Sequence, residues 1–472
     1  MRNTKIVCTI GPASEKEEIL TKIIEAGMNA SRHNFSHGDH EEHAARINMV
    51  KKLAEKSQKQ IAIILDTKGP EIRTGKFAEG KVELKVGANF DIYAGADVIG
   101  DDTKCSVTYA GLATDVKIGD RILIDDGLVG LEVKGIEGNK IQTMVLNTGM
   151  VGTHKGVNVP GVPIKLPAMT EKDIEDLKFG CKIGVHIVAA SFIRKAEDVT
   201  AIREILNNNG GKNVHIYSKI ENQEGVDNID EILAVSDGIM VARGDLGVEI
   251  PIEKVPSVQK MIIEKCNKYG KPVITATQML DSMIRNPRPT RAEVSDVANA
   301  ILDGTDAIML SGESANGSWP VEAVETMATI AMEAEKNLTY EGASLKHGKK
   351  AKTIGGSISR SVCNVAMELN AAAIITSTQS GSTARRVSRY KPESPIIAVT
   401  PNESVAKQLA LVWGVYPILA DKIETTDEMI AQAGEMAMKT GFVKKGDIIV
   451  IAAGLPIHEV GSTNMLQVSI VE

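Results

Sequence analysis

The chain contains 472 residues, of which 43% are hydrophobic and 24% are charged, and its formal net charge is −7 at pH 7. A chain of this length predicts about two to four globular domains. The acidic balance argues against nucleic acid as the main partner. The five cysteines are scattered, odd in number and without the spacing of a zinc site, which is typical of buried thiols in a reducing compartment.

No segment of the sequence predicts membrane insertion or export. The apolar runs all fall short of the ~20 residues that cross a bilayer. The N-terminal sequence MRNTKIVCTIGPAS enters a predicted strand directly and lacks the apolar core of a signal peptide. We therefore expect a cytoplasmic protein with no membrane partner.

In the first part of the chain, apolar runs predict strands within residues 5–11 and 61–67, and the segment MNASRHNFSHG, residues 28–38, is the second strand candidate between them; helices separate the three. The third run, IAIILDT, is almost continuously apolar and β-branched, as in a strand buried on both faces. Ser14 precedes Glu17 by three residues, and this spacing predicts a capping box for the first helix. These features predict a β-α-β-α-β beginning.

Residues 70–168 break this alternation. They are rich in glycine and contain short alternating runs, and the sequences DDG and EGN are typical of hairpin turns. We interpret this segment as an inserted all-β domain, a small β-barrel that follows the third strand. In that place it would act as a lid over the preceding domain.

The α/β alternation resumes at Thr170, which with Asp173 forms a second predicted capping box. Further apolar runs predict strands within residues 186–192, 214–221, 238–245, 272–278 and 306–313. With the first three runs they make eight β/α units, the number that forms a TIM barrel. We therefore expect an α/β fold in which residues 1–69 and 169–340 form a TIM (β/α)8 barrel.

A polar and basic segment, residues 338–352, is interpreted as a linker. The remaining chain contains five strand candidates, with helices between most of them: AAAIITST, PIIAVT, GVYPILA, DIIVIAAG and LQVSIV. This pattern predicts a C-terminal domain, residues 341–472, with an open and mainly parallel α/β sheet.

Charged residues gather where two of the predicted barrel strands end. Lys219 and Glu221 lie on one face of a strand because side chains alternate with a period of two, and Gly244 and Asp245 end the next run. Two carboxylates at one rim would hold a hard divalent cation such as Mg²⁺. Lys219 would add positive charge for an anionic substrate. The alternative for each residue alone is an ordinary solvated charge at a strand end.

Eight motifs in order carry a resemblance to one family: TKIVCTIGPAS, NFSHG, LDTKGPEIR, KGVNVPG, SFIRKA, SKIEN, VARGDLG and ITATQMLDSM followed by PTRAEVSDVANA. Over essentially the whole chain, this order resembles the pyruvate kinase family. The resemblance implies phosphoryl transfer from phosphoenolpyruvate to ADP, giving pyruvate and ATP in glycolysis. It also implies a homotetramer of the bacterial type, and because the sequence ends at Glu472 we expect no additional C-terminal domain.

The resemblance implies a role for each rim residue. Glu221 and Asp245 would bind Mg²⁺ or Mn²⁺, while Lys219 would neutralise the phosphoryl group during transfer. Thr277 would orient a water or relay a proton where the enolate is protonated; the alternative is a strand residue without chemistry. Catalytic roles are thus implied for Lys219, Thr277 and Arg32, and the implied substrate-binding set is Arg32, Ser191, Lys219, Gly244, Asp245 and Thr277.

The resemblance also implies a K⁺ site and a nucleotide site. The K⁺ ligands would be oxygens of Asn34, Ser36, Asp66 and Thr67, and the nucleotide contacts would be Asn34, His37, Arg73 and Lys155. Glu71 is the residue type that accompanies K⁺ dependence in the family. The alternative for Ser36 is a cap of the next helix, expected from about residue 39 to 56. Arg32, implied to hold the phosphate, and Arg73 could instead form loop salt bridges.

Two positions depart from the family pattern. His33 stands where an apolar residue is usual, and His186 stands where an acidic residue is common. We interpret both as structural. His33 nevertheless neighbours the implied phosphate and cation ligands, and we hypothesise that a protonated imidazole there would weaken K⁺ binding.

The resemblance further implies an allosteric site in the C-terminal domain for a sugar phosphate or nucleotide effector. Its phosphate would be held by the loop comprising Thr376, Ser377, Thr378, Gln379, Ser380, Gly381, Ser382 and Thr383, with residues 454–464 closing over it. The alternative is an ordinary loop with capping hydroxyls. For the whole protein, the competing functions are a metal-dependent enolate lyase or aldolase on the same barrel, and a sensor without catalysis.

Overall fold

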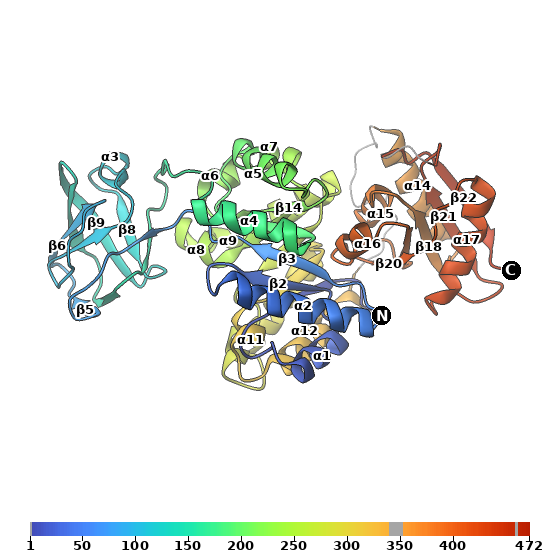
Figure 1. Cartoon of the computed structure of the whole chain (residues 1–472), viewed down its shortest axis with the longest axis horizontal. Helices are drawn as coiled ribbons and strands as arrows, with labels where there is room; N and C mark the ends of the chain where they lie inside the picture. Colours follow the sequence, from blue (N-terminus) through green and yellow to red (C-terminus); the bar gives the residue numbers. More distant parts are fainter. Residues whose placement is uncertain (1, 339–352, 458–460) are drawn as a thin grey trace.

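The computed structural model describes residues 2–338, 353–457 and 461–472. Three units lie in a row (Figure 1): an all-β unit at one end, a barrel in the centre and an α/β unit at the other end. The segment interpreted as a linker, residues 338–352, falls outside the described residues except for Leu338. No helix among the described residues has the length and apolar character needed to cross a bilayer.

The central unit is a closed barrel of eight parallel strands in the order β1-β17-β16-β15-β14-β13-β3-β2. The strands are β1 (Lys5–Thr9), β2 (Ala30–Asn34), β3 (Ala62–Asp66), β13 (Ile187–Ala190), β14 (His215–Ile220), β15 (Gly238–Ala242), β16 (Val273–Ala276) and β17 (Ala307–Leu310). All eight lie within the predicted runs, and the predicted TIM barrel is confirmed. Inward-facing side chains such as Val7, Ile64 and Met240 are buried and fill its interior.

Helices surround the barrel, and two short 3-10 turns, Ile252–Lys254 and Asp281–Ile284, connect some of them. The helices are α1 (Glu17–Ala26), α2 (His40–Lys56), α4 (Glu171–Ile183), α5 (Ala196–Asn208), α6 (Gln223–Asp227), α7 (Ile229–Val235), α8 (Arg243–Glu249), α9 (Val255–Tyr269), α10 (Arg291–Asp303), α11 (Gly312–Ala315) and α12 (Pro320–Glu335).

One of the two predicted capping boxes is present. Thr170 and Asp173 exchange both bonds of the box at the start of α4. The box predicted for Ser14 is wrong, because its hydroxyl accepts the N–H of Gly11 at 3.1 Å and closes a turn before α1 begins. Ser36 is not a helix cap either, since Asp39 caps α2 by accepting the N–H of Glu42 at 2.9 Å.

The all-β unit follows β3, as predicted. Its main sheet has the order β4-β12-β8-β9-β10-β6-β7, and β5 pairs with β11 in a second sheet. The N–H of Gly75, just after β4, donates to the carbonyl of Ser106 in β7 at 2.8 Å, so the main sheet nearly closes into a barrel. The elements are β4 (Ile72–Arg73), β5 (Lys81–Leu84), β6 (Asn89–Ala94), β7 (Lys104–Val107), α3 (Leu112–Asp115), β8 (Arg121–Ile124), β9 (Val129–Glu137), β10 (Lys140–Val145), β11 (Gly149–Gly152) and β12 (Gly156–Asn158).

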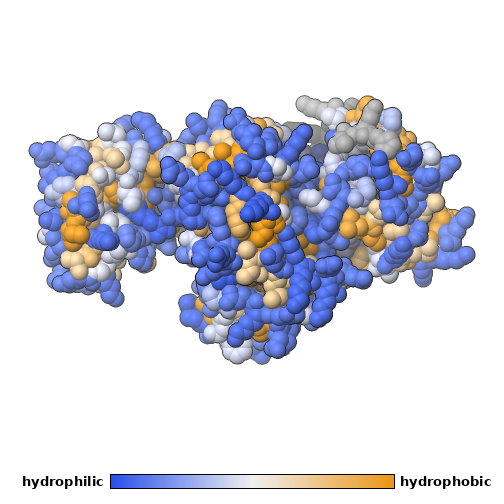
Figure 2. Space-filling view, viewed as in Figure 1, coloured by the Kyte–Doolittle hydropathy of each residue, from blue (hydrophilic) through white to orange (hydrophobic). Residues whose placement is uncertain are grey.

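The C-terminal unit is an open five-stranded sheet in the order β20-β19-β18-β21-β22, in which only the pair of β21 and β22 is antiparallel. This confirms the predicted mainly parallel α/β domain. Its elements are α14 (Ile354–Glu368), β18 (Ala373–Ser377), α15 (Ser382–Ser388), β19 (Ile396–Thr400), α16 (Glu403–Leu409), β20 (Val415–Leu419), α17 (Thr426–Lys439), β21 (Ile448–Ala453) and β22 (Met465–Ile470). On the face shown in Figure 2, hydrophilic residues predominate over all three units.

The two outer units contact opposite ends of the barrel. The α/β unit meets the amino ends of the strands, where Gln408 of α16 donates to the carbonyl of His186 at 3.2 Å. The all-β unit meets the carboxyl ends, where Asn158 donates to Glu249 of α8 at 2.8 Å. Since active sites of TIM barrels lie at the carboxyl ends, the all-β unit is placed over the chemistry, and we call it the lid.

Candidate active site

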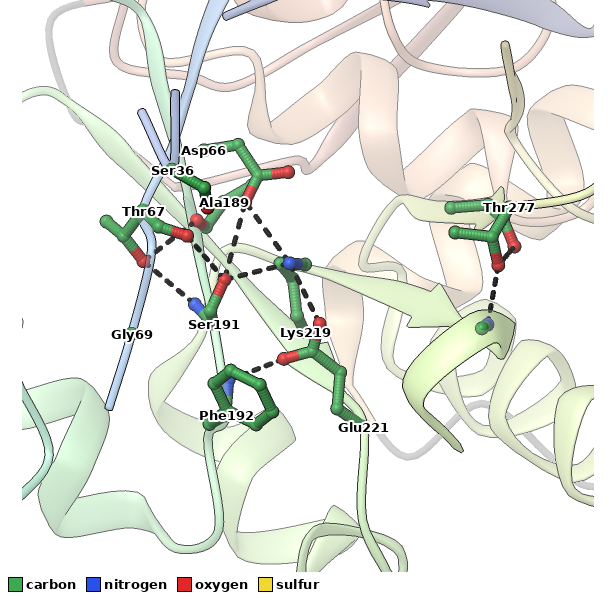
Figure 3. Close-up of polar contacts among 12 residues, drawn as sticks. Ser36, Asp66, Thr67, Gly69, Ala189, Ser191, Phe192, Lys219, Glu221 and Thr277 are labelled. Carbon is green, nitrogen blue, oxygen red and sulfur yellow. Dashed lines mark hydrogen bonds and ion pairs between the residues drawn. The ribbon is translucent and has the colours of Figure 1, made fainter. Parts of the chain in front are cut away.

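A buried cluster of charges lies at the carboxyl ends of three neighbouring strands, β3, β13 and β14. The ammonium nitrogen of Lys219 is 2.8 Å from Glu221 Oε1 and 3.2 Å from Asp66 Oδ1. It also donates to the hydroxyl of Ser191 at 2.8 Å. Figure 3 shows Lys219 pointing into the space enclosed by these three side chains. The sequence places Lys219 and Glu221 two residues apart, and alternation directs both to this cluster.

Asp66 is fully buried between two cations. Its Oδ2 accepts from Arg32 Nε at 2.5 Å, and Arg32 is oriented by a second bond, from Nη1 to the hydroxyl of Thr9 at 3.0 Å. Burial by itself raises the pKa of Asp66, but the charges of Arg32 and Lys219 outweigh it, so the pKa lies below its usual range. Asp66 therefore stays ionised and holds both cations at the rim.

Glu221 is also fully buried. Its Oε2 accepts the N–H of Phe192 at 2.6 Å. Burial raises the pKa of Glu221, the ammonium of Lys219 opposes this, and the charge of Asp245 raises it further. Two carboxylates thus influence each other from adjacent strand ends. Such an arrangement is stabilised by a divalent cation with oxygen ligands.

The residues implied as K⁺ ligands lie on the neighbouring strand ends. Asn34 pairs with Asp66 across β2 and β3, and its Oδ1 accepts the N–H of Ser36 at 3.2 Å. The carbonyl of Thr67 accepts the hydroxyl of Ser191 at 2.6 Å. Figure 3 shows Ser36, Asp66 and Thr67 close together. All their ligating atoms would be oxygens, the donor type that an alkali cation needs.

Thr277 forms a separate part of the rim, drawn apart from the charge cluster in Figure 3. Its hydroxyl donates to the carbonyl of Ala276 at 2.6 Å and accepts the N–H of Gly244 at 2.7 Å. Thr277 has a φ of 71°, a left-handed conformation that costs a β-branched residue about 1–2 kcal/mol. Gly244 lies in the first turn of α8.

Arg243 holds the strained turn in place. Its Nη2 donates to the carbonyl of Thr277 at 2.7 Å and its Nε to the carbonyl of Ala276 at 3.1 Å. Asp296 on α10 accepts from Nη1 at 2.7 Å and fixes the guanidinium. Sequence reasoning missed this role, although Arg243 lies inside the quoted motif VARGDLG. The partners are backbone carbonyls more than thirty residues away, and no local pattern identifies them.

A cavity of about 540 Å³ lies between the lid and the barrel rim, and we call it the lid cavity. Arg73 and Lys155 line it from the lid, and Asp245 lines it from α8. In this structure both lid cations have partners: Arg73 pairs with Glu71 at 2.5 Å, and Lys155 pairs with Asp125 at 3.0 Å. The structure thus brings two of the predicted nucleotide residues to one cavity, together with a predicted metal ligand.

One predicted nucleotide residue, His37, lies outside the lid cavity, and one residue that was not predicted, Asp126, lines it. His37 is exposed on the loop after β2 and does not line the cavity. Asp126, which sequence reasoning missed, lines it from the lid hairpin with a φ of 53°. Burial raises the pKa of Asp126, and the charges of Asp245 and Asp125 add to this rise. The sequence DDG predicted only the turn.

The two histidines that depart from the family pattern are structural, as interpreted. His33 is fully buried, and its Nε2 lies 3.1 Å from the hydroxyl of Ser31. Burial lowers its pKa to about 3, with smaller contributions from His43 and Arg46. The hypothesis of a protonated imidazole beside the cation ligands is therefore not supported at neutral pH. His186 is buried at the other end of the barrel, where its Nδ1 accepts the N–H of Ile63 at 2.9 Å.

The predicted effector loop lies between β18 and α15. Hydroxyl residues of this loop, including Ser377 and Thr383, line a cavity of about 20 Å³ together with Gly454 and Ser462. This volume holds about one water. Residues 458–460 of the second predicted loop fall outside the described residues. The two loops are linked by the hydroxyls of Thr383 and Thr463, which lie 3.0 Å apart.

An eight-stranded barrel with buried charges at the carboxyl ends of its strands and a lid over that end defines a TIM-barrel enzyme. Residues 1–324 match the family profile described as pyruvate kinase, barrel domain, and residues 356–469 match the profile of the pyruvate kinase alpha/beta domain. The chain therefore belongs to the pyruvate kinase family and is a phosphotransferase.

Relatives along the whole chain agree with this assignment. The chain is 63% identical over 473 residues to the pyruvate kinase of Clostridium acetobutylicum, and the alignment covers all of both chains. It is 54% identical to the pyruvate kinase of Geobacillus stearothermophilus and 56% identical to that of Bacillus licheniformis. These two alignments cover all of this chain and 80% and 81% of the relatives. The family assignment favours the kinase over the lyase and the sensor considered from the sequence.

Proposed function

We propose that the enzyme transfers the phosphoryl group of phosphoenolpyruvate to ADP, giving pyruvate and ATP. The observation that carries this proposal is the buried Lys219, held at the rim between the carboxylates of Asp66 and Glu221. The pKa of Lys219 is raised, because the two carboxylates outweigh the lowering effect of burial. A permanent and immobile positive charge is what stabilises the charge that spreads over a phosphoryl group in transfer.

Glu221 and Asp245 would hold the divalent cation, Mg²⁺ or Mn²⁺. No group of three or more acidic, histidine or cysteine side chains suited to a metal occurs in the described part of the chain. Two carboxylates fit a catalytic Mg²⁺, which keeps positions for water and substrate oxygens. The bound cation would polarise the oxygens of the substrate. Burial raises the pKa of Glu221 and the charge of Asp245 adds to this rise; the cation would relieve the part due to Asp245.

The substrate would bind between the charge cluster and α8. Arg32 would hold the phosphate through the part of its planar guanidinium that faces the rim. The N–H groups of Gly244 and Asp245 would receive the carboxylate. In this structure the N–H of Gly244 donates to the hydroxyl of Thr277, so the arriving carboxylate would compete for that bond. Freed from it, the hydroxyl would orient a water or relay a proton to the enolate.

A K⁺ ion would bind to oxygens of Asn34, Ser36, Asp66 and Thr67. Asp66 supplies the negative charge that offsets a cation near Arg32 and Lys219. ADP would contact Asn34 and His37 on the barrel and Arg73 and Lys155 on the lid. Closure of the lid would turn the two lid cations away from Glu71 and Asp125 and toward the phosphates.

The effector site in the C-terminal domain is a further part of the proposal. The support is the group of hydroxyls and backbone N–H groups in residues 376–383, which suits a phosphate. Because the cavity there measures about 20 Å³, a phosphorylated ligand would need the second loop to move outward. The homotetramer, the domain boundaries and the cytoplasmic location stay predictions.

The test is ATP formation from phosphoenolpyruvate and ADP with Mg²⁺, measured with K⁺ and then with Na⁺ as the monovalent cation. We expect activity that needs K⁺ and is lost in the variant K219M. Activity without K⁺ would keep the reaction and discard the cation site. No activity in either salt, even with sugar phosphates and nucleotides added as effectors, would overturn the proposed reaction.

A further inference from the structure

The loop that joins β2 to α2, residues 35–39, carries Ser36 and His37 and is held on both sides. Toward the barrel, the N–H of Phe35 donates to the carbonyl of Asp66 at 3.0 Å, and the N–H of His37 donates to the carbonyl of Asn34 at 3.3 Å. These bonds fix the backbone relative to the two strands that carry Asn34 and Asp66. The carbonyls of Phe35 and His37 are bound by side chains of the helices α4 and α2.

His43 on α2 holds the carbonyl of His37. The ring is 2% exposed, and its Nε2 lies 2.8 Å from that oxygen. Because a carbonyl can only accept, the ring must carry its proton on Nε2. The ring also stacks on the buried ring of Phe35, with centroids 3.9 Å apart and planes 11° apart. Stacking and burial therefore fix the orientation of the imidazole ring, with its Nε2–H toward the carbonyl of His37.

Two further features set the path of the loop. Lys172 on α4 donates to the carbonyl of Phe35 at 2.8 Å and is itself paired with Asp176 at 2.6 Å. Gly38 has a φ of 75°, and a Cβ there would lie 2.6 Å from the carboxylate of Glu42 and 3.6 Å from His43 Nε2. The positive φ therefore favours glycine in the turn that brings the carbonyl of His37 to the ring of His43.

We propose that His43 is a positioning residue for the monovalent cation and the nucleotide. This inference rests on the proposed function, in which Ser36 binds K⁺ and His37 contacts ADP. A K⁺ ion is bound only by the dipoles and charge of its oxygen ligands, so its affinity depends on how well those oxygens are held in place beforehand. His43 touches neither ligand directly and acts through the backbone between them.

Two substitutions separate the hydrogen bond from the packing. H43F keeps an aromatic ring against Phe35 but removes the donor, whereas H43Q supplies an amide N–H without the stack. The matched control is H186L, which removes another buried histidine that bonds to the backbone, at the opposite end of the barrel. The constants measured in H186L show how a loss of stability by itself affects K⁺ and ADP binding.

The first readout is binding without turnover. The midpoint of thermal unfolding is measured against K⁺ concentration, with tetramethylammonium keeping the ionic strength constant and no substrate present. The second readout is the KM for ADP and the KM for phosphoenolpyruvate at saturating K⁺. In H43F we expect the half-saturating K⁺ concentration to rise about tenfold or more, as found when a group that orients a metal ligand is removed.

The KM for ADP should rise in the same variant, while the KM for phosphoenolpyruvate should change less than about twofold. H43Q should stay near the wild type, and H186L should lower the unfolding midpoint without changing either constant. Unchanged constants in H43F, equal changes in H186L, or a failure of H43Q to recover them would each overturn the inference.

The measurements distinguish a failure of the proposed K⁺ site from a failure of the positioning role of His43. If the wild type shows no response to K⁺, the proposed cation site fails, and the KM for ADP in H43F alone decides the role of His43. If H43F does not fold, K172M takes its place, because Lys172 holds the carbonyl of Phe35 in the same loop from a half-exposed position. We then expect a smaller rise in both constants, and no rise would overturn the inference.

Discussion

Replacing Lys219 with methionine should abolish phosphoryl transfer and should also destabilise the fold in a manner that depends on pH. The ammonium lies 2.8 Å from Glu221 and 3.2 Å from Asp66, and both carboxylates are fully buried. Asp66 keeps Arg32 as a partner in the variant. Glu221 keeps only the N–H of Phe192 among the contacts described above. The loss in the free energy of unfolding of K219M should therefore come mainly from the unpaired carboxylate of Glu221.

The size of the effect follows from the charges. With an effective dielectric constant of 20, each contact corresponds to about 5–6 kcal/mol of Coulomb attraction. Desolvation of the ions offsets much of this, and breaking a buried pair by removing one partner costs about 3–5 kcal/mol. A proton on Glu221 reduces the cost, because it neutralises the uncompensated carboxylate.

The pH dependence has a definite sign. Burial raises the pKa of Glu221 to about 7 in the folded protein, and without the ammonium of Lys219, which opposes this rise, the pKa becomes higher still. A carboxyl group whose pKa is raised by folding destabilises the folded state progressively above its unfolded pKa of about 4.3. The loss in K219M should therefore be larger at pH 8 than at pH 6, by up to about 1.4 kcal/mol per pH unit.

Urea unfolding of the wild type, K219M, E221Q and the double variant measures this effect, with EDTA present so that no divalent cation substitutes for the lysine. We expect E221Q to restore most of the stability of K219M without restoring activity. Additive losses in the double variant, or equal losses in K219M at pH 6 and pH 8, would show that the pair is not coupled in this way.

Two further predictions concern other groups. T277S keeps the hydroxyl and should retain kcat within a few fold, whereas T277A should lower kcat about a hundredfold, as expected for a group that moves or orients a proton; steady-state kinetics that place both variants at one level would contradict this role. His33 and His186 have folded pKa values of about 3, below the unfolded value of about 6.5, so the stability that each contributes is complete above pH 6.5 and falls toward pH 3. As the pH is lowered from 7 to 6 and 5, the free energy of unfolding measured in urea should fall less in H33L than in the wild type, by up to about 1.4 kcal/mol per pH unit. An equal fall in the two proteins would contradict this prediction.

The sequence predicted the strands and the rim because both follow from local rules. Most barrel strands are apolar runs, although β2 has the polar sequence ASRHN, and alternation alone places Lys219 and Glu221 on one face. His33 shows that a residue next to site residues in the sequence need not lie at the site. It neighbours Arg32 and Asn34 in the chain, yet the same alternation turns it away from the rim into a buried site where it stays neutral.

Some contacts carry no signal in the sequence, whether their partners are close in the chain or far from it. The spacing of Ser14 and Glu17 fits a capping box, but the hydroxyl of Ser14 closes a turn with Gly11 instead. Arg243 carries no signal of its task, because its partners are carbonyls of a strand end that meets α8 only after the barrel has closed. His43 carries no recognisable signal for a different reason: its partner is a backbone oxygen only six residues away, and this spacing belongs to no known motif.

Helix α8 connects the separate parts of the site. Near its start, Gly244 is bonded to the strained Thr277. Asp245 lines the lid cavity and adds to the rise that burial causes in the pKa of Glu221. At its end, Glu249 accepts from Asn158 of the lid at 2.8 Å. A rotation of the lid therefore acts on the same seven-residue helix that carries Asp245, the proposed metal ligand, and the N–H groups proposed to bind the substrate carboxylate. Lid closure and substrate binding are for this reason expected to be coupled, since each biases the position of one short rigid element.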